Sequence, residues 1–395
     1  MLRLDSLRMP PLVLGVAMVL LAGCSSNEPR EQPVPPPQGQ GDYRLTANWS
    51  KHLADGHDNQ HLFLQPAVVG DRVYAAAAKG YIGAYDARTG RETWWTRVDN
   101  RLIGGIGTDS EQLYVVTTDA VLKALSHDGD LNWEVQLPTE SLVAPQSNGR
   151  QVVVQTVEGQ LIAFSQNNGE RQWQYDSNMP VLSFRGNAVP WVDGSQVVAG
   201  FDNGRVVSLD VADGSVEWQQ ALGSPSGRTQ LERIVDVDAS PVVRDGSVYI
   251  AGYQGKVAAL SLRTGEEAWS RSVSSLRAPA VDNGRIVVAA ADGQLVGYDL
   301  DSRREIWRHN KLEWRRLSAP IVLGDRVLVG DFEGYLYAVD QDDGSIAART
   351  YVDDGGIRSA MVRYRDTVIL LSNSGLVASY RIEEREPDSW FLSSP

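Results

Sequence analysis

A Gly-x-x-x-Trp unit recurs about every forty residues along this chain of 395 residues. Five complete copies end at Trp94, Trp133, Trp173, Trp218 and Trp269. A sixth copy, at residues 302–307, keeps the tryptophan without the glycine, and a seventh, at 343–348, keeps the glycine without the tryptophan. Self-similarity at this period is typical of repeat architectures, so each copy is expected to build one supersecondary unit.

A second turn signal runs in step with the first. A polar residue followed by Gly separates two short apolar runs at Gly80, Gly159, Gly204, Gly255, Gly293, Gly334 and Gly375, and Ala120 holds the remaining place. Glycine permits the positive φ values that a tight hairpin turn needs. The flanking runs are rich in Val, Leu, Ile and Tyr and have the length of strands. Each unit therefore predicts a four-stranded antiparallel sheet whose last strand carries the tryptophan.

Eight such units predict an all-β fold, an eight-bladed β-propeller over residues 43–382 followed by a C-terminal tail at 383–395. The last unit lacks an outer strand, and Trp49 stands in a matching context near the N-terminal end of the repeats. Pairing of these N- and C-terminal strands would close the ring and remove a free sheet edge. The recurring tryptophans are expected to pack between neighbouring blades.

The first 23 residues predict a signal peptide, with a basic start, an apolar stretch and a small-residue cleavage site. Cys24, the only cysteine, follows directly, and Leu-Ala-Gly-Cys resembles a bacterial lipoprotein signal in which this cysteine is lipidated. A plain secretory signal with a stray thiol is the alternative. Residues 24–42 are rich in Pro, Gln and Gly, so we expect a lipidated flexible tether that packs on nothing.

Composition and motifs argue against catalysis and against nucleic acid. The net charge of −13 opposes nucleic-acid binding, because contact with a phosphate backbone needs a basic footprint. We find no nucleophile elbow and no complete glycine-rich nucleotide loop. His52, His57 and His61 share one loop, but their spacing matches no metal-ligand pattern, and a solvated loop is the favoured interpretation. We therefore expect no catalytic residue, no metal and no cofactor.

Two connections between units are longer than the rest, at residues 176–190 and 224–241. Both link the outer strand of one blade to the inner strand of the next, so they should emerge as neighbours on one face. Long loops on a rigid scaffold commonly carry function, and apolar residues beside an arginine are typical of interfaces. The candidate interface residues are Leu182, Phe184, Arg185, Asp236 and Asp238. Loops that pack only on themselves are the alternative.

Two resemblances bear on these patterns. Residues 84–94, AYDARTGRETW, resemble the repeat of pyrroloquinoline quinone (PQQ) enzymes, which are usually much longer and often carry adjacent cysteines that this chain lacks. The lipoprotein signal, the tether, the repeats and the loops VLSFRG and ERIVDVDASPVV together resemble the BamB family, lipoproteins of the outer-membrane β-barrel assembly machinery.

The second resemblance implies a non-enzymatic scaffold, lipid-anchored on the periplasmic face of the outer membrane. It also implies that the five candidate interface residues contact the polypeptide-transport-associated (POTRA) domains of the barrel subunit, BamA. Nascent outer-membrane proteins are a further implied partner. The alternative is a periplasmic propeller that binds a small ligand in its channel, as a sensor or a degenerate quinoprotein.

The lipoprotein signal generates a first prediction. Cys24→Ala should release the protein from the membrane fraction while leaving it folded, because the acyl chains that bury themselves in the bilayer are lost. Fractionation followed by a high-salt wash measures this. A Cys24→Ala protein that still pellets with outer membranes would show that lipidation is not the main anchor.

Overall fold

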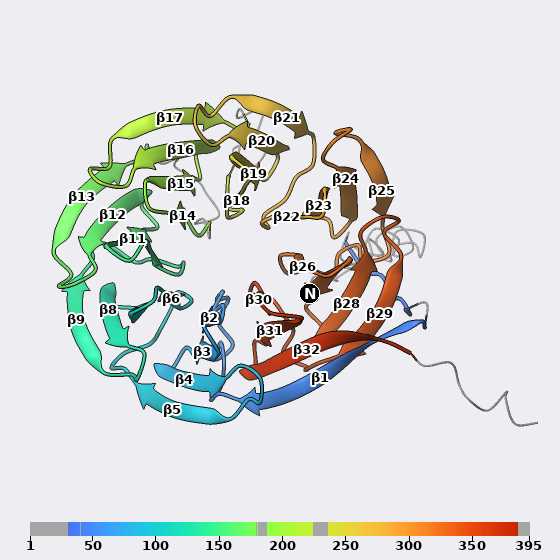
Figure 1. Ribbon diagram of the computed structural model, residues 1–395, viewed down its shortest axis with the longest axis horizontal. Helices are drawn as coiled ribbons and strands as arrows, with labels where there is room; N and C mark the ends of the chain where they lie inside the picture. The colour runs from blue at the N-terminus through green and yellow to red at the C-terminus, as the bar shows by residue number, and fades with distance from the viewer. Residues whose placement is uncertain (1–30, 40, 179, 181–187, 224–235, 386–395) are drawn as a thin grey trace, which may run out of the picture. The chain divides into compact units, whose positions relative to one another are not determined.

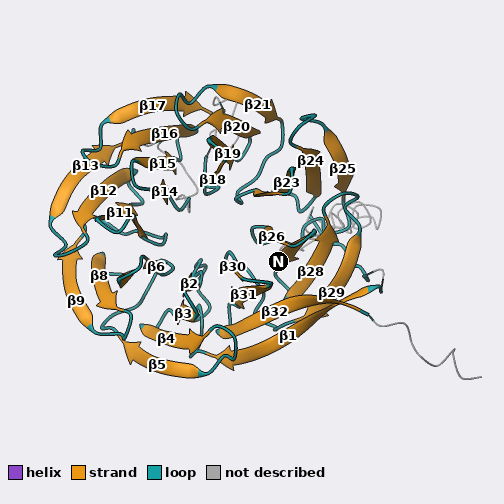
Figure 2. Cartoon of the chain, in the orientation of Figure 1, coloured by secondary structure: helices purple, strands orange, loops and turns teal. Residues whose placement is uncertain are grey.

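The computed structural model describes residues 31–39, 41–178, 180, 188–223 and 236–385. Within the unit Pro33–Pro395, the described residues form eight four-stranded antiparallel sheets arranged in a ring (Figure 1). Strands and turns account for the ordered structure of this part, and no helix in it is long and apolar enough to span a membrane (Figure 2). The predicted eight-bladed β-propeller is confirmed.

In the first seven blades the strands run from the axis outward in sequence order. The first holds β2 (Ala67–Val69), β3 (Arg72–Ala76), β4 (Tyr81–Asp86) and β5 (Glu92–Arg97). The second holds β6 (Gly107–Thr108), β7 (Gln112–Val116), β8 (Val121–Ser126) and β9 (Leu131–Gln136). The third holds β10 (Gln146–Ser147), β11 (Gln151–Gln155), β12 (Gln160–Ser165) and β13 (Arg171–Asp176). The fourth holds β14 (Trp191–Val192), β15 (Gln196–Gly200), β16 (Arg205–Asp210) and β17 (Val216–Ala221).

The other half of the ring repeats this order. The fifth blade holds β18 (Val242–Arg244), β19 (Ser247–Ala251), β20 (Val257–Ser261) and β21 (Glu267–Arg271). The sixth holds β22 (Ala280–Asp282), β23 (Arg285–Ala289), β24 (Leu295–Asp299) and β25 (Glu305–His309). The seventh holds β26 (Ile321–Leu323), β27 (Arg326–Gly330), β28 (Tyr335–Asp340) and β29 (Ile346–Tyr351). The eighth holds β30 (Val362–Tyr364), β31 (Thr367–Leu371), β32 (Leu376–Glu384) and β1 (Tyr43–His52).

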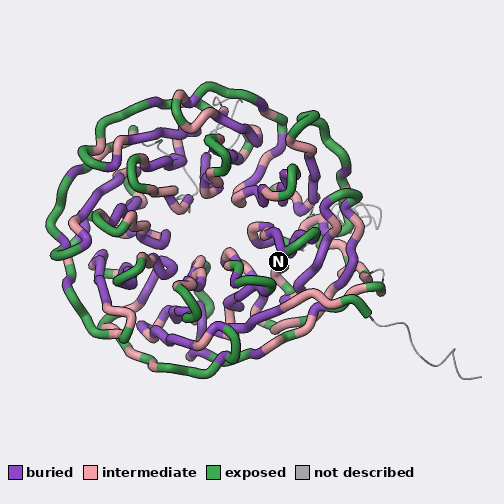
Figure 3. Tube along the Cα trace, viewed as in Figure 1, coloured by how far each residue is buried: buried purple, intermediate pink, exposed green. Residues whose placement is uncertain are grey.

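Burial follows the position of a strand in its blade. The two middle strands are buried along almost their whole length, as in β19 and β20, because neighbouring blades cover both of their faces (Figure 3). The outer strands alternate instead, and the buried position of β21 is Trp269. Continuous apolar runs therefore mark the middle strands in the sequence, and the tryptophan marks the outer one.

The Gly-x-x-x-Trp unit joins each blade to the next. The indole N–H of Trp49 donates to the carbonyl of Ala87, and its ring lies where a Cβ on Gly90 would come within 2.5 Å. Gly90 has a φ of 68°, so glycine serves both the turn and the close approach of the ring. The same bond, at 2.7–3.1 Å, is made by Trp49, Trp94, Trp133, Trp173, Trp218, Trp269 and Trp307.

The two irregular copies of the unit have structural explanations. In the sixth turn Arg303 takes the place of glycine, adopts a φ of 59°, and still offers its carbonyl to Trp269. In the seventh copy Ala348 replaces tryptophan at the seam with the eighth blade, whose outer two strands belong to opposite ends of the chain. No turn connects β32 to β1, so a tryptophan there would lack its usual glycine and carbonyl.

Ring closure occurs between the chain ends, as predicted. Strand β1 pairs antiparallel with β32, from Tyr43 opposite Glu384 to His52 opposite Leu376. A bulge between Ala47 and Trp49 adjusts the register. The pairing continues beyond the strands, where the amide of Arg385 donates to the carbonyl of Asp42 at 2.8 Å.

The segment before β1 packs on the propeller, which differs from the expectation of a free tether. Arg315 donates to the carbonyl of Val34 at 2.7 Å, and Arg349 donates to that of Pro36 at 2.6 Å. Gly39 lies so close to the seventh blade that a Cβ would be 2.8 Å from Cα of Ala348. We call residues 33–39 the N-terminal strap. It lies over the seam that lacks a tryptophan.

Closure through Trp49 generates the second prediction. Trp49→Ala should lower the free energy of unfolding by about 3–5 kcal/mol, since it removes a buried ring and one hydrogen bond. Chemical denaturation measures the loss. Trp95→Ala is the matched control, because Trp95 is 60% exposed and should cost far less. Equal losses in the two variants would contradict the role given to the closing strand.

Candidate functional site

The connections between blades define one face of the ring. Strands alternate in direction within a blade, so each outer-to-inner connection emerges beside the hairpin that joins the two middle strands. Backbone bonds tie them together, such as Val98 N–H to the carbonyl of Gly80 at 3.0 Å and Leu222 N–H to that of Gly204 at 2.9 Å. We call this the long-loop face, since it carries the connections 177–190 and 222–241.

These two long connections are neighbours where the structure describes them. The amide of Val189, near the end of the first, donates to Oγ of Ser240, near the end of the second, at 2.9 Å. The start of the first connection is held by Asn203, whose side chain donates to Ser177 Oγ at 3.0 Å and to the carbonyl of Asn178 at 2.8 Å. The predicted adjacency is therefore confirmed at these ends.

The five candidate interface residues fall into two groups. Leu182, Phe184 and Arg185 lie outside the described residues. Asp236 and Asp238 are described and are 0% and 6% exposed, so both lie at the buried base of the second connection. The structure therefore places both acids away from the solvent-facing position that a direct ion pair with a partner would need.

Backbone contacts hold this base in place. The carbonyl of Asp236 accepts a bond from Tyr253 N–H at 2.7 Å, and Val237 N–H donates to the carbonyl of Phe201 at 3.2 Å. These partners belong to the hairpins of the fifth and fourth blades. Asp236 and Val237 thus fix the end of the second connection between the fourth and fifth blades, just before β18 begins.

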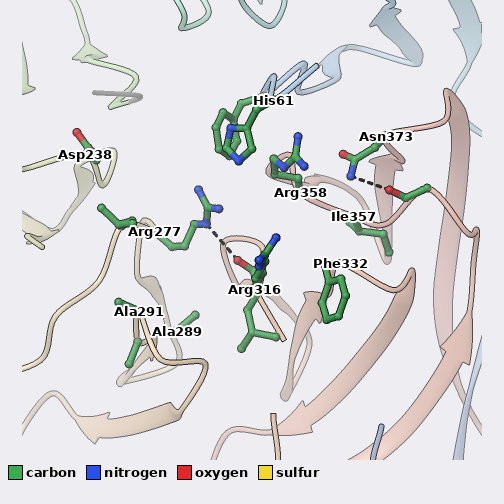
Figure 4. Close-up of a pocket in the computed structure, with 15 residues that line it drawn as sticks. His61, Asp238, Arg277, Ala289, Ala291, Arg316, Phe332, Ile357, Arg358 and Asn373 are labelled. Carbon is green, nitrogen blue, oxygen red and sulfur yellow. Dashed lines mark hydrogen bonds between the residues drawn. The ribbon is translucent and has the colours of Figure 1, made fainter. Parts of the chain in front are cut away.

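Asp238 is held in its neutral form. Burial, together with nearby Asp202 and Asp236, raises its pKa to about 8, and Arg277 opposes them. Its Oδ1 atom is buried and has no hydrogen-bond partner among the described residues. Asp238 lines a cavity near the axis of the ring, and Arg277 lines the same cavity (Figure 4).

The histidine loop also borders the axis. His52 is exposed, whereas His57 is 1% exposed and burial lowers its pKa to about 4, with Arg358 and His61 adding to the shift. His61 lines the axial cavity. Across the described ranges, no group of three or more His, Cys, Asp or Glu side chains is placed to hold a metal ion.

Three arginines of the axis were missed by the sequence analysis. They are Arg277, Arg316 and Arg358, which lie in the connections that enter the sixth, seventh and eighth blades respectively. The available signal was positional: in three successive repeats an arginine stands one to three residues before the Ala-Pro or Ala-Met pair that precedes the inner strand. Aligning the repeats on that pair would have placed all three at the axis.

Comparison with known proteins places this geometry in a family. The family described as "Outer membrane protein assembly factor BamB" matches residues 46–143, 78–309 and 264–393. The chain belongs to the BamB family. A BamB from Marinobacter adhaerens is 43% identical over 376 residues, covering 94% of this chain and 96% of the relative. BamB from Yersinia pestis is 33% identical over 389 residues, covering 95% and 99%.

Solved structures agree with the fold. The crystal structure of BamB from Moraxella catarrhalis matches with a TM-score of 0.79 at 26% identity, covering 85% of this chain and 99% of that one. The quinohemoprotein alcohol dehydrogenase from Comamonas testosteroni matches with a TM-score of 0.67 at 14% identity, covering 87% and 78%. The second likeness shows the fold alone. The BamB relatives are named as assembly factors, and the prediction that the chain is not an enzyme is confirmed.

The buried acid generates the third prediction. The native state keeps a proton on Asp238 up to a pKa of about 8, whereas the unfolded chain releases it near the ordinary value of 3.8. Titration of Asp238 therefore hardly changes the free energy of unfolding near pH 4. It lowers that free energy progressively as the pH rises to about 8. Asp238→Asn should raise the Tm by a few degrees at pH 8 and hardly at all at pH 4.

Thermal melts across that pH range measure the effect. Asp301→Asn is the matched control, because Asp301 is exposed and should leave the Tm unchanged throughout. A gain for Asp238→Asn that is the same at pH 4 and pH 8 would show that the buried acid does not titrate as described.

Proposed function

We propose that this protein is a non-enzymatic scaffold of outer-membrane protein assembly. The observation that carries the proposal is the family match, which extends over the repeats from residue 46 to 393 and over nearly the full length of the relatives named outer membrane protein assembly factor. Pairing of β1 with β32 closes the ring, and the closed ring gives such a scaffold a rigid body from which long loops project.

The proposed partner is BamA, the barrel subunit of the assembly complex, contacted at its POTRA domains by the long-loop face. Two connections that are bonded to each other at their ends support a single continuous binding surface rather than two separate ones. Leu182, Phe184 and Arg185 would supply its apolar and cationic contacts. This pairing of an apolar anchor with arginine is typical of interface hot spots.

Asp236 and Asp238 would act on this surface indirectly. Both are buried at the base of the second connection, and Asp236 is bonded through its backbone to the fifth blade. Their contribution to docking is therefore to hold the end of that connection against the blades. Loss of either acid would alter the interface by moving the loop that leaves the ring there.

The remaining elements of the proposal concern location and substrate. Lipidation at Cys24 would anchor the propeller on the periplasmic face of the outer membrane, since several acyl chains bind a bilayer stably where one does not. Nascent outer-membrane proteins would be met at the same complex. Exposed outer strands such as β5, with Trp95 on its solvent side, offer edges for transient pairing with them.

The fourth prediction tests the docking face. Arg185→Glu should weaken binding to the BamA POTRA domains by tenfold or more, as expected for loss of a hot spot worth about 2 kcal/mol. Leu182→Ala should weaken binding to a similar extent. Calorimetry or biolayer interferometry measures the affinity, and a thermal melt of the same samples shows whether the variants stay folded.

Arg150→Glu is the matched control. Arg150 is exposed in the hairpin between β10 and β11, which emerges on the face opposite the long loops, so binding should be unchanged. A folded Arg185→Glu protein that binds as tightly as wild type would remove the long-loop face from the interface. Lost binding in step with a lowered Tm would instead favour loops that hold each other.

A further inference from the structure

A cavity of about 420 Å³ lies at the axis of the ring. Its walls come from connections and hairpins of several blades, so no single repeat could form it (Figure 4). The apolar part of the wall is made by Phe63, Leu276, Leu317, Phe332 and Ile357. Cavities of roughly 300–1,000 Å³ with a few convergent polar groups are typical of small-molecule sites.

Three arginines from consecutive blades meet at this cavity. Arg277, Arg316 and Arg358 lie around one space in Figure 4, with Asp238 and His61 on its far sides. They enter from the connections that precede β22, β26 and β30. Repetition of the blade thus brings together side chains that are about forty residues apart in the sequence.

Each guanidinium is positioned by a contact with an uncharged group. Arg277 donates from Nε to the carbonyl of Leu317 at 3.1 Å and lies 4.9 Å from the ring centre of Phe63. Arg316 lies 5.8 Å from that of Phe332. Arg358 donates to the carbonyl of Gln60 at 3.3 Å. Neutral carbonyls and aromatic faces orient these cations, and donors remain for a ligand.

No carboxylate among the described residues lies within ion-pair distance of these three arginines. The contrast with the neighbouring Arg315 is direct, since that side chain is 1% exposed and pairs with Asp331 at 2.7 Å and with Glu333. One loop therefore carries a compensated arginine and an uncompensated one side by side. Acidic residues outnumber basic ones in this protein, whose net charge is −13, yet none of the described acids pairs with Arg316.

Burial and repulsion between like charges act on two of the three arginines. Burial lowers the pKa of Arg277 to about 10, and repulsion by Arg358 contributes. Burial and Arg316 likewise lower the pKa of Arg358. Arg316 also adopts a φ of 50°, in the left-handed region that non-glycine residues rarely occupy. Like charges and strain gathered at one cavity are typical of a binding site.

Unpartnered polar atoms point to the same conclusion. Asp238, which is 6% exposed, lines the cavity and has no hydrogen-bond partner for Oδ1 among the described residues. Asn373 donates to the carbonyl of Gly355 at 2.8 Å, while its own Oδ1 lacks a partner in that same part of the chain. A buried carboxyl in its neutral form can donate its proton to an anionic oxygen.

We propose that the axial cavity binds a small organic polyanion, a molecule with two or more carboxylate or phosphate groups, through Arg277, Arg316 and Arg358. The planar fork of arginine matches carboxylate and phosphate oxygens in pairs. The apolar walls accommodate the carbon skeleton that separates those groups. A volume of about 420 Å³ suits a small molecule and not a folded partner. Binding at this cavity does not rest on the docking of the long loops, although Asp238 lies at the base of the second long connection and also lines the cavity.

The test uses the full mature chain and two probes, citrate for carboxylates and pyrophosphate for phosphates, with acetate as the monoanion. Calorimetry at low ionic strength should show saturable binding of citrate, of pyrophosphate or of both, and far weaker binding of acetate. The probe that binds more tightly identifies the source of the anionic groups. If neither polyanion binds better than acetate, the proposal is overturned.

Variants separate binding from structure. Arg316→Gln and Arg358→Gln should each weaken polyanion binding at least tenfold, while the Tm of the unliganded protein stays equal or rises because repulsion within the cluster is relieved. Arg150→Gln, on the opposite face, should change neither quantity. Binding that survives in a double variant, Arg316→Gln with Arg358→Gln, would show that the probes bind elsewhere and would also overturn the proposal.

Discussion

The propeller depends on one repeated interaction, in which an indole from the outer strand of seven of the eight blades packs against the turn of the next blade. In a single contact it buries a large ring, satisfies its N–H and fits a turn whose glycine leaves space for it. Blades have no covalent connection on their outer rim, so this contact is what sets their spacing there. The loops and the axial cavity inherit their positions from that spacing.

The exception at Ala348 follows from the same rule. The ring closes inside the eighth blade, where β32 and the outer strand β1 come from opposite ends of the chain, so the turn that would receive an indole from the seventh blade does not exist. The N-terminal strap occupies that seam instead, with Gly39 directly against Ala348. The absence of a tryptophan at Ala348 therefore follows from the way the ring closes and not from random divergence of the repeat.

The sequence predicted the fold well because its determinants are local. Turn glycines and apolar runs each predict a hairpin or strand in their own part of the sequence, and Trp49 predicts the closing strand. Together they predict the number of blades and the way the ring closes. Burial of Asp236 and Asp238 was not predictable, since acids in a long loop read as solvent-exposed until the neighbouring blades are present. The meeting of Arg277, Arg316 and Arg358 depends on the curvature of the whole ring, which no single repeat encodes. Contacts of the strap, made by Pro36 and Gly39, carry no periodic signal.

The packing of the N-terminal strap on the propeller also limits the length of free chain that follows Cys24. Between Cys24 and Pro33 there are nine residue steps, which span about 30 Å at full extension. A lipid on Cys24 would therefore allow Pro33 a reach of about 30 Å from the bilayer, whereas a free tether from Cys24 to Tyr43 would allow about twice that reach. Tension on the anchor would be borne by Arg315 and Arg349, so the seam without a tryptophan would be the point at which the membrane pulls on the ring.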